Sequence, residues 1–335
     1  MQGTKQTYPK ISIVTPSYNQ GKYIEQTIQS VLSQNYPNLE YIIIDGGSSD
    51  NTVEIIKKYE GQLTYWISEP DAGQTDAINK GYSRCTGDIF NWINSDDYYE
   101  ADVFFKLAQI FINNPSVKAV CGREWGFKDV DPVDKILHQG TVIGKNVFET
   151  IRIGIIDQPC TFFRKEFINT FFPLDNSLRY VMDRQMWWSY LLKYGQDNIL
   201  KTLEIFTNFR LHSQSKSISE AELFEAEFDR LKLTLFRQLN APEIVQNQLH
   251  NNTVPLNKHW EIGIRPVDFI TAAFTAWYAE RCYVKDDLPA LLKLMKLVKK
   301  WKGNKMNKKE WKLWLISAII PWSLLKTFKQ IKSRI

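Results

Sequence analysis

The residues best suited to chemistry form the tetrapeptide Asn94-Ser95-Asp96-Asp97, which directly follows the apolar run IFNWI at residues 89–93. Carboxylate oxygens are preferred ligands of Mg²⁺ and Mn²⁺, which are commonly held by one or two carboxylates together with substrate phosphates. Such a metal neutralises the charge of a departing diphosphate. The alternative is that Asp96 and Asp97 only cap a following helix. Their position behind a buried strand favours a metal site.

Three earlier apolar runs also end in polar side chains. Thr15 and Ser17 follow the first run, Asp45 follows the second, and Glu69 and Asp71 follow the third. In an open α/β sheet, ligands bind outside the carboxyl ends of the strands. Four consecutive runs with polar ends therefore predict one site to which all of them contribute.

The elements that must position these side chains alternate between strand and helix patterns over the first hundred residues. Repeated units of this kind predict an α/β fold with a parallel central sheet, right-handed crossovers and helices on both faces. The apolar periodicity predicts strands at 11–15, 41–44, 63–68 and 89–93 and helices at 21–34, 51–59 and 74–85.

After residue 100 the pattern becomes mixed. We expect strands at 117–121 and 160–163 and helices at 102–113, 181–194, 217–240 and 266–300. The chain is predicted to divide into a domain at 1–215, with halves at 1–100 and 101–215, a helical extension at 216–300 and a basic, Trp-rich tail at 301–335.

The composition is that of a globular protein, with 44% hydrophobic and 24% charged residues in a chain of 335. The four cysteines lie far apart, which argues against a zinc site or a disulfide scaffold and favours a reducing, cytoplasmic setting. The first ten residues contain no apolar stretch, so we expect no signal peptide.

The charge is strongly asymmetric. Residues 293–335 contain 13 Lys and Arg against the single acid Glu310, a net charge of +12, so the rest of the chain carries −7 within the total of +5. An acidic body with a basic tail is not the pattern of a nucleic-acid-binding enzyme, in which basic residues line the cleft. We therefore expect no nucleic-acid partner.

The tail also contains an apolar, Trp-rich stretch at residues 311–325, interrupted by Lys312 and Pro321. It is shorter than the roughly 20 residues needed to span a bilayer. Flanking lysines and interfacial tryptophans predict peripheral attachment to an anionic membrane surface, on its cytoplasmic face. The alternative is a terminal helix that packs on the body of the protein or on a partner.

Several motifs, in order along the chain, resemble glycosyltransferase family 2, whose members have the GT-A fold. The resemblance covers residues 10–100 closely and continues less tightly to about residue 215. Its motifs are VTPSYN at 14–19, SVLSQ at 30–34, IDGGSSDNT at 44–52, EPDAGQTDAINKG at 69–81, TGD at 86–88 and NSDD at 94–97.

The resemblance implies an inverting enzyme that moves a sugar from a nucleotide-diphosphate sugar, UDP-linked by implication, to an acceptor hydroxyl. It implies a Mn²⁺ or Mg²⁺ cofactor and, as acceptor, a lipid-linked saccharide or surface glycan. The residues implied in donor binding are Thr15, Tyr18, Asp45, Asp76, Asn79 and Ser95, and those implied at the metal are Asp96, Asp97 and His212.

Two positions depart from the family pattern. Gly46 stands where many members have a second Asp, and Asn94 replaces the first Asp of the family's D-x-D motif. Contacts to the base, the ribose and the metal therefore do not transfer directly from the motif.

An inverting transfer needs a base that takes the proton from the acceptor hydroxyl. Asp183 resembles the family's acidic residue on the acceptor-side helix, and Gln158, Trp187 and Trp188 resemble an acceptor site in which the rings stack on sugars. The alternatives are a surface Asp on an amphipathic helix with two core tryptophans and, for His212, a structural histidine.

Two other functions share some of these features. A metal-dependent nucleotidyltransferase would need a basic phosphate-binding loop near the first strand, but residues 15–21 contain no Arg or Lys. The segment Gly46-Gly47-Ser48-Ser49 also lacks the spacing of a dinucleotide-binding or P-loop motif. A non-catalytic nucleotide-sugar-binding membrane scaffold would lack metal-dependent donor hydrolysis.

Overall fold

The computed structural model describes residues 8–129, 131–212, 220–250 and 252–319. The chain divides into two compact units. Unit 1 comprises Met1–Ile143 and Gly154–Glu227, and unit 2 comprises Gly144–Ile153 and Phe228–Ile335.

Unit 1 is built on a mixed sheet of nine described strands in the order β3-β2-β1-β4-β8-β6-β9-β5, with β7 paired to β6. The strands are β1 (Ile11–Ser17), β2 (Leu39–Asp45), β3 (Tyr65–Ser68), β4 (Ile89–Trp92), β5 (Tyr98–Tyr99), β6 (Ala119–Lys128), β7 (Asp131–His138), β8 (Thr161–Arg164) and β9 (Ile199–Leu211). The first four strands pair in parallel, as predicted, whereas β8 is antiparallel to both of its neighbours, β4 and β6.

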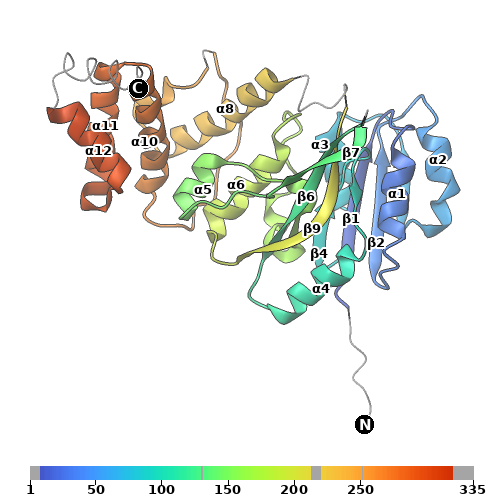
Figure 1. Ribbon diagram of the computed structural model, residues 1–335. Helices are drawn as coiled ribbons and strands as arrows, with labels where there is room; N and C mark the ends of the chain where they lie inside the picture. Colours follow the sequence, from blue (N-terminus) through green and yellow to red (C-terminus); the bar gives the residue numbers. More distant parts are fainter. Residues whose placement is uncertain (1–7, 130, 213–219, 251, 320–335) are drawn as a thin grey trace, which may run out of the picture. The chain divides into compact units, whose positions relative to one another are not determined.

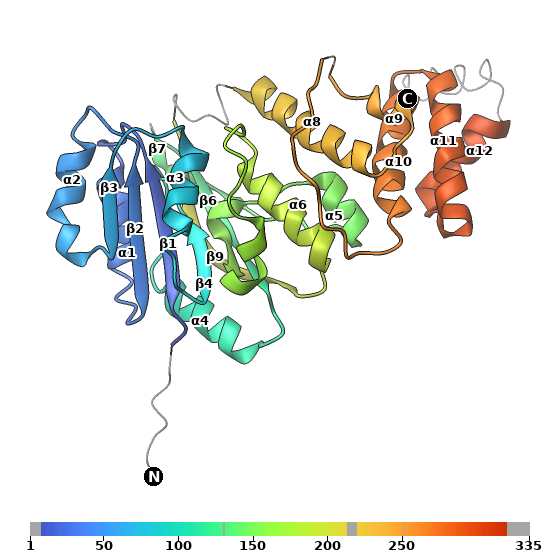
Figure 2. The same cartoon turned by 180° about the vertical axis from the view of Figure 1, so that it is seen from behind.

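Helices cover both faces of this sheet, and α1 and α3 lie on opposite sides of it (Figures 1 and 2). The helices of unit 1 are α1 (Ile24–Leu32), α2 (Thr52–Lys58), α3 (Gln74–Tyr82), α4 (Val103–Asn113), α6 (Met182–Tyr194) and the first part of α8 (Ala221–Gln238). The side chains of β2 from Glu40 to Asp45 are all buried, which explains the continuous apolar run that predicted this strand. The central α/β arrangement is confirmed.

The periodicity missed the strands that complete the sheet. The predicted strand at 117–121 extends to Lys128 and continues through the β6–β7 hairpin, and β9 was not predicted. Gly122 and Gly126 weaken the strand signal within β6, since glycine disfavours strand interiors. A Cβ atom at Gly122 would lie 2.4 Å from the Phe206 ring of β9, so the close packing of the two strands requires glycine here.

Unit 2 is helical over its described residues. It contains α5 (Val147–Ile153), the rest of α8, α9 (Glu243–Gln246), α10 (Asp268–Val284), α11 (Leu288–Lys302) and α12 (Lys308–Ile319). The single helix predicted at 266–300 is two helices, because Asp286 adopts a positive φ of 61° and the Asp287 side chain caps α11 by accepting from the Ala290 amide at 3.1 Å.

The tail predicted at 301–335 is only partly described. Its first part forms α12, which packs on α11 within unit 2: Lys299 lies 3.7 Å from the centroid of the Trp311 ring, and Lys302 pairs with Glu310 at 2.5 Å. Residues 320–335 lie outside the described residues. Among the described helices, none has both the length and the apolar character needed to cross a bilayer.

Candidate functional site

Asp96 lies in the turn between β4 and β5, at the carboxyl end of the central parallel strands. Its Oδ2 lies 3.0 Å from Nε2 of His212, which directly follows β9. These two residues are 116 positions apart in the chain, and they meet because β5 pairs antiparallel with β9. The structure thus brings together two of the three predicted metal ligands.

The third predicted ligand, Asp97, points into the protein and is 1% exposed. Its Oδ1 accepts the Arg210 backbone N–H at 2.9 Å, whereas its Oδ2 has no hydrogen-bond partner among the described residues. Burial, followed by the charge of Asp96, raises the pKa of Asp97 well above its usual range. A buried carboxylate oxygen without a partner is the kind of group that a bound cation satisfies.

This donor set suits a hard cation that is shared with a substrate. The described residues contain no group of three or more His, Cys, Asp or Glu side chains placed to hold a metal by themselves. The pair of Asp96 and His212, with Asp97 buried next to Asp96 in the chain, would therefore leave coordination positions to substrate phosphates, which is how proteins commonly hold Mg²⁺. The residues present fit such an ion.

The predicted nucleotide residues lie at the ends of β1 and β2. Tyr18 is 62% exposed, whereas Thr15 is fully buried and hydrogen bonds the Tyr41 hydroxyl at 3.1 Å. Asp45 is also fully buried, and it accepts hydrogen bonds from Ser48 and from Ser68 at 2.6 Å. Asp45 therefore fixes the turn after β2, and a contact with a base stays a prediction.

Helix α3 carries the other two predicted donor residues, Asp76 and Asn79. The Asn79 amide donates to the Leu174 carbonyl at 2.9 Å and accepts from the Leu174 N–H at 2.8 Å. Asp76 accepts from Asn176 at 3.3 Å. Both residues hold the loop that precedes α6, so α3 connects the donor half to the acceptor half.

Ser95 lies in the turn after β4, and its side chain is buried. In the same turn, the Asn94 side chain accepts a hydrogen bond from Gln74 of α3 at 2.7 Å. Gln158 donates to the Asn91 side chain at 2.6 Å and to the Trp92 carbonyl at 2.7 Å. Gln158 is thus a buried brace between the loop before β8 and strand β4, and its predicted contact with an acceptor is not tested by these bonds.

Asp183 lies in the first turn of α6, where burial raises its pKa to about 6 and the Arg184 guanidinium opposes that shift. Asp157 lies on the loop before β8, and burial raises its pKa to about 7, with a further contribution from the charge of Glu124. Both carboxyl groups therefore change charge near neutral pH, as general acids and bases do.

Trp187 and Trp188 are fully buried. Trp187 stacks on Tyr190 with the ring centroids 5.8 Å apart and meets the edge of Phe163. Neither ring has an exposed face on which a sugar could stack, so the structure gives both a packing role in place of the predicted acceptor contact. Most side chains of α6 from Met182 to Leu192 are buried, with Asp183 and Arg184 in the first turn as the exceptions.

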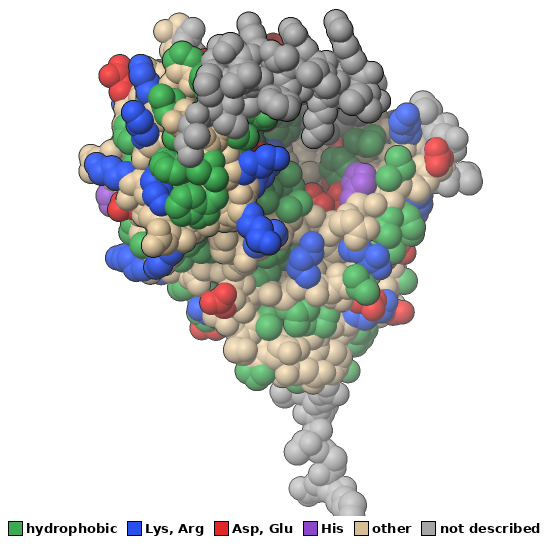
Figure 3. Space-filling view, turned by 60° about the vertical axis from the view of Figure 1, so that its left-hand side comes forward, with side chains coloured by type: hydrophobic (Ala, Val, Ile, Leu, Met, Phe, Trp, Pro, Cys, Tyr) green, Lys and Arg blue, Asp and Glu red, His purple; other side chains and the backbone are tan. Residues whose placement is uncertain are grey.

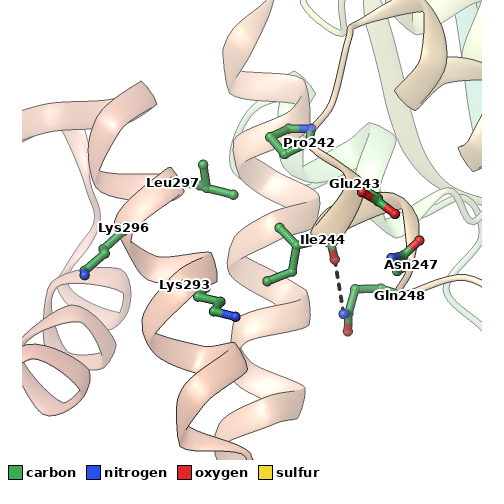
Figure 4. A pocket seen from close by; sticks show the side chains of 8 residues that line it. All are labelled: Pro242, Glu243, Ile244, Asn247, Gln248, Lys293, Lys296 and Leu297. Carbon is green, nitrogen blue, oxygen red and sulfur yellow. Dashed lines mark hydrogen bonds between the residues drawn. The ribbon is translucent and has the colours of Figure 1, made fainter.

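A groove with a volume of about 570 Å³ lies within unit 2, between α9 and α11 (Figure 4). Ile244 of α9 faces Leu297 and Lys293 of α11 across it, and Gln248 donates to the Ile244 carbonyl at 3.2 Å. None of the predicted donor, metal or acceptor residues lines this groove.

Comparison with known proteins gives concordant results. The family model described as glycosyl transferase family 2 matches residues 12–172. An uncharacterized glycosyltransferase of Mycobacterium tuberculosis is 35% identical over 121 residues, which are 36% of this chain and 45% of the relative. The poly-β-1,6-N-acetyl-D-glucosamine synthase of Staphylococcus epidermidis is 30% identical over 137 residues, 40% of this chain and 31% of that protein. The chain spans about half the length of the first curated relatives, 45–53%.

Solved structures extend the likeness in fold to both halves of the chain. The crystal structure of S. aureus TarS 1–349 in complex with UDP-GlcNAc has a TM-score of 0.57 and 17% sequence identity, and the match covers 92% of this chain and 90% of that one. At this identity the likeness establishes the fold.

Proposed function

Since residues 12–172 form a glycosyl transferase family 2 domain on a GT-A fold, we propose that the chain transfers a sugar from a nucleotide-diphosphate sugar to an acceptor hydroxyl. The observation that carries this proposal is the pair of Asp96 and His212, 3.0 Å apart at the carboxyl end of the central strands. Ligands bind at this edge in open α/β sheets.

Asp96 and His212 would hold Mn²⁺ or Mg²⁺, with Asp97 beneath them. When bound, the cation would neutralise the charge of the leaving diphosphate. The resemblance assigns Thr15, Tyr18 and Asp45 to a pocket for a uridine nucleotide. Of the three, only Tyr18 is exposed, so its ring offers a surface on which a base could stack.

Asp183 is the proposed general base of an inverting transfer. It would accept the proton of the acceptor hydroxyl as the oxygen attacks the anomeric carbon. Its raised pKa supports this role, since a base is most effective when its pKa lies near the working pH. Asp76 and Asn79 hold the loop that precedes α6. This loop would fix the position of Asp183, at the start of α6, relative to the bound donor.

The proposed acceptor is a lipid-linked saccharide or a surface glycan at the cytoplasmic face of a membrane. The relative named as a poly-β-1,6-N-acetyl-D-glucosamine synthase supports a glycan acceptor.

The proposed membrane-binding surface lies on α11 and α12. Residues 288–319 contain nine Lys and one Glu, a net charge of +8, and Leu315 of α12 is 43% exposed. Figure 3 shows Lys and Arg side chains bordering a hydrophobic patch, as expected of a surface that binds anionic lipid.

The test is a screen of UDP- and GDP-sugars for hydrolysis that depends on Mn²⁺ or Mg²⁺. We expect one donor class to be hydrolysed, and Asp96→Ala to reduce the rate at least about a hundredfold with an unchanged melting temperature. Asp197→Ala, at an exposed loop position, is the matched control and should keep full activity. Normal activity of Asp96→Ala across a metal titration would exclude the proposed site, and donor binding without hydrolysis would favour the non-catalytic scaffold.

A further inference from the structure

Arg210, near the end of β9, is a buried cation whose hydrogen bonds converge on the proposed metal site. The residue is 8% exposed, and its backbone N–H, Nε, Nη1 and Nη2 all donate hydrogen bonds. The backbone N–H donates to Asp97 Oδ1 at 2.9 Å, and Nε donates to the Asp96 carbonyl, also at 2.9 Å. The guanidinium Nη1 and Nη2 donate to Asp129 and Gln26 at 2.9 and 2.5 Å.

These bonds join four separate segments of unit 1. Asp96 and Asp97 belong to the turn after β4, Gln26 belongs to α1, Asp129 follows β6, and Arg210 itself belongs to β9. A planar guanidinium presents its donors in a fixed fork, so the direction of one bond sets the direction of the others. Lysine keeps the charge but cannot reproduce this geometry.

Asp129 is the acidic partner of the Arg210 guanidinium. It accepts hydrogen bonds from Lys22 Nζ at 2.6 Å, from the Tyr23 hydroxyl at 3.0 Å and from Arg210. The bond from Lys22 is the largest cause that lowers the pKa of Asp129 to about 2. Asp129 therefore remains ionised at any working pH, and its bond to Arg210 is charge-assisted and strong.

Tyr23 connects the same group to the second proposed ligand. The Tyr23 ring lies 4.9 Å from the His212 ring between centroids, and the Arg210 guanidinium lies 4.8 Å from the Tyr23 centroid. Arg210 thus contacts both residues of the Asp96–His212 pair, which are 3.0 Å apart. It hydrogen bonds the Asp96 carbonyl directly, and it reaches His212 through the Tyr23 ring.

We propose that Arg210 is a positioning residue for the cation site, with Asp129 as its anchor: together they hold the Asp96-Asp97 turn and His212 in the arrangement that binds the metal. The inference rests on the proposed function, since it specifies what keeps that site in shape. In this role Arg210 touches neither the donor nor the acceptor, and it acts through Asp96, Asp97 and His212.

The test measures Mn²⁺ binding directly as well as through activity. Arg210→Lys keeps the charge, and Asp129→Asn keeps the shape of the anchor. We expect Arg210→Lys to raise the Kd for Mn²⁺, measured by calorimetry with UDP present, at least about tenfold, and Asp129→Asn to raise it several-fold. The double variant should be no weaker than Arg210→Lys, because both changes break one unit.

Arg164→Lys is the matched control. Arg164 also donates to backbone carbonyls, those of Val117 and Phe111 at 2.8 Å, and neither carbonyl belongs to the proposed site. Its variant should change the melting temperature and leave Mn²⁺ binding unchanged. If Arg210→Lys is folded and binds Mn²⁺ like the unsubstituted protein, the positioning role is wrong. If Arg210→Lys does not fold, Asp129→Asn decides by the same measurement, and absence of Mn²⁺ binding by the unsubstituted protein would instead refute the proposed function.

Discussion

The pH dependence of sugar transfer offers the sharpest test of Asp183 as the general base. Burial raises the pKa of this carboxyl to about 6, against 3.8 for an exposed aspartate. A base must be ionised to accept a proton, so about 90% of the protein would be competent at pH 7 and about 10% at pH 5. The transfer rate at subsaturating substrate should therefore fall about tenfold over these two pH units. A base with an ordinary pKa would lose less than about a tenth of its activity.

Asp183→Asn keeps the size of the side chain and removes the proton acceptor. We expect transfer to fall by about 10²–10⁴ at pH 7, while donor binding measured by calorimetry changes little. The residual rate should no longer vary between pH 5 and pH 7. The assay follows release of nucleotide diphosphate together with incorporation of labelled sugar into the acceptor, so that transfer is distinguished from hydrolysis.

Two results would refute this reasoning. One is a transfer rate of the unsubstituted protein that stays constant down to pH 5 and falls only near pH 4. The other is an Asp183→Asn variant with full transfer activity, which would make Asp183 a structural residue at the start of α6.

Two further predictions concern stability and membrane attachment. Burial raises the pKa of Asp157 to about 7, so its contribution favours the fold at acid pH and is lost as the pH rises from about 4 to about 7. Asp157→Asn should therefore be more stable than the unsubstituted protein at pH 8, on the order of 2–4 kcal/mol, and equally stable below pH 4, as measured by denaturant unfolding. Asp197→Asn is the exposed control and should show no such difference. On α12, replacing the exposed Lys308 and Lys312 by Glu should lower partition onto anionic vesicles at least about tenfold in low salt, and equal sedimentation of the two proteins would assign α12 to packing alone.

Two helical segments, α6 and the predicted helix at 266–300, show what apolar periodicity alone does not predict. The helical pattern predicted α6, but whether Trp187 and Trp188 are buried or exposed depends on the elements that pack around the helix. Both rings are fully buried, so the prediction that they stack on sugars does not hold, whereas the alternative of two core tryptophans does. The predicted helix at 266–300 is broken because Asp286 has a positive φ and the Asp287 side chain caps the next helix. The apolar pattern continues on both sides of this break, so periodicity alone did not predict it.

The sequence by itself determined the parallel half of the sheet and the edge at which its polar side chains gather. Both follow from local properties: strand and helix periods within about ten residues, and the rule that parallel strands direct their carboxyl ends to one edge. The positions of Asp45 and Asp96 at that edge were therefore predictable, as was the match of residues 12–172 to glycosyl transferase family 2 from the order of the motifs.

Only the tertiary structure decided which distant residues meet at that edge. His212 reaches Asp96 through the pairing of β5 with β9, and Arg210 reaches Asp129 because β9 lies beside β6. Strand pairing over such separations depends on burial of both faces and on close approaches such as Gly122 against Phe206, which no local pattern contains. The residues proposed to hold the metal could be suspected from the sequence, whereas the residues proposed to position them became visible only when the strands had been placed side by side.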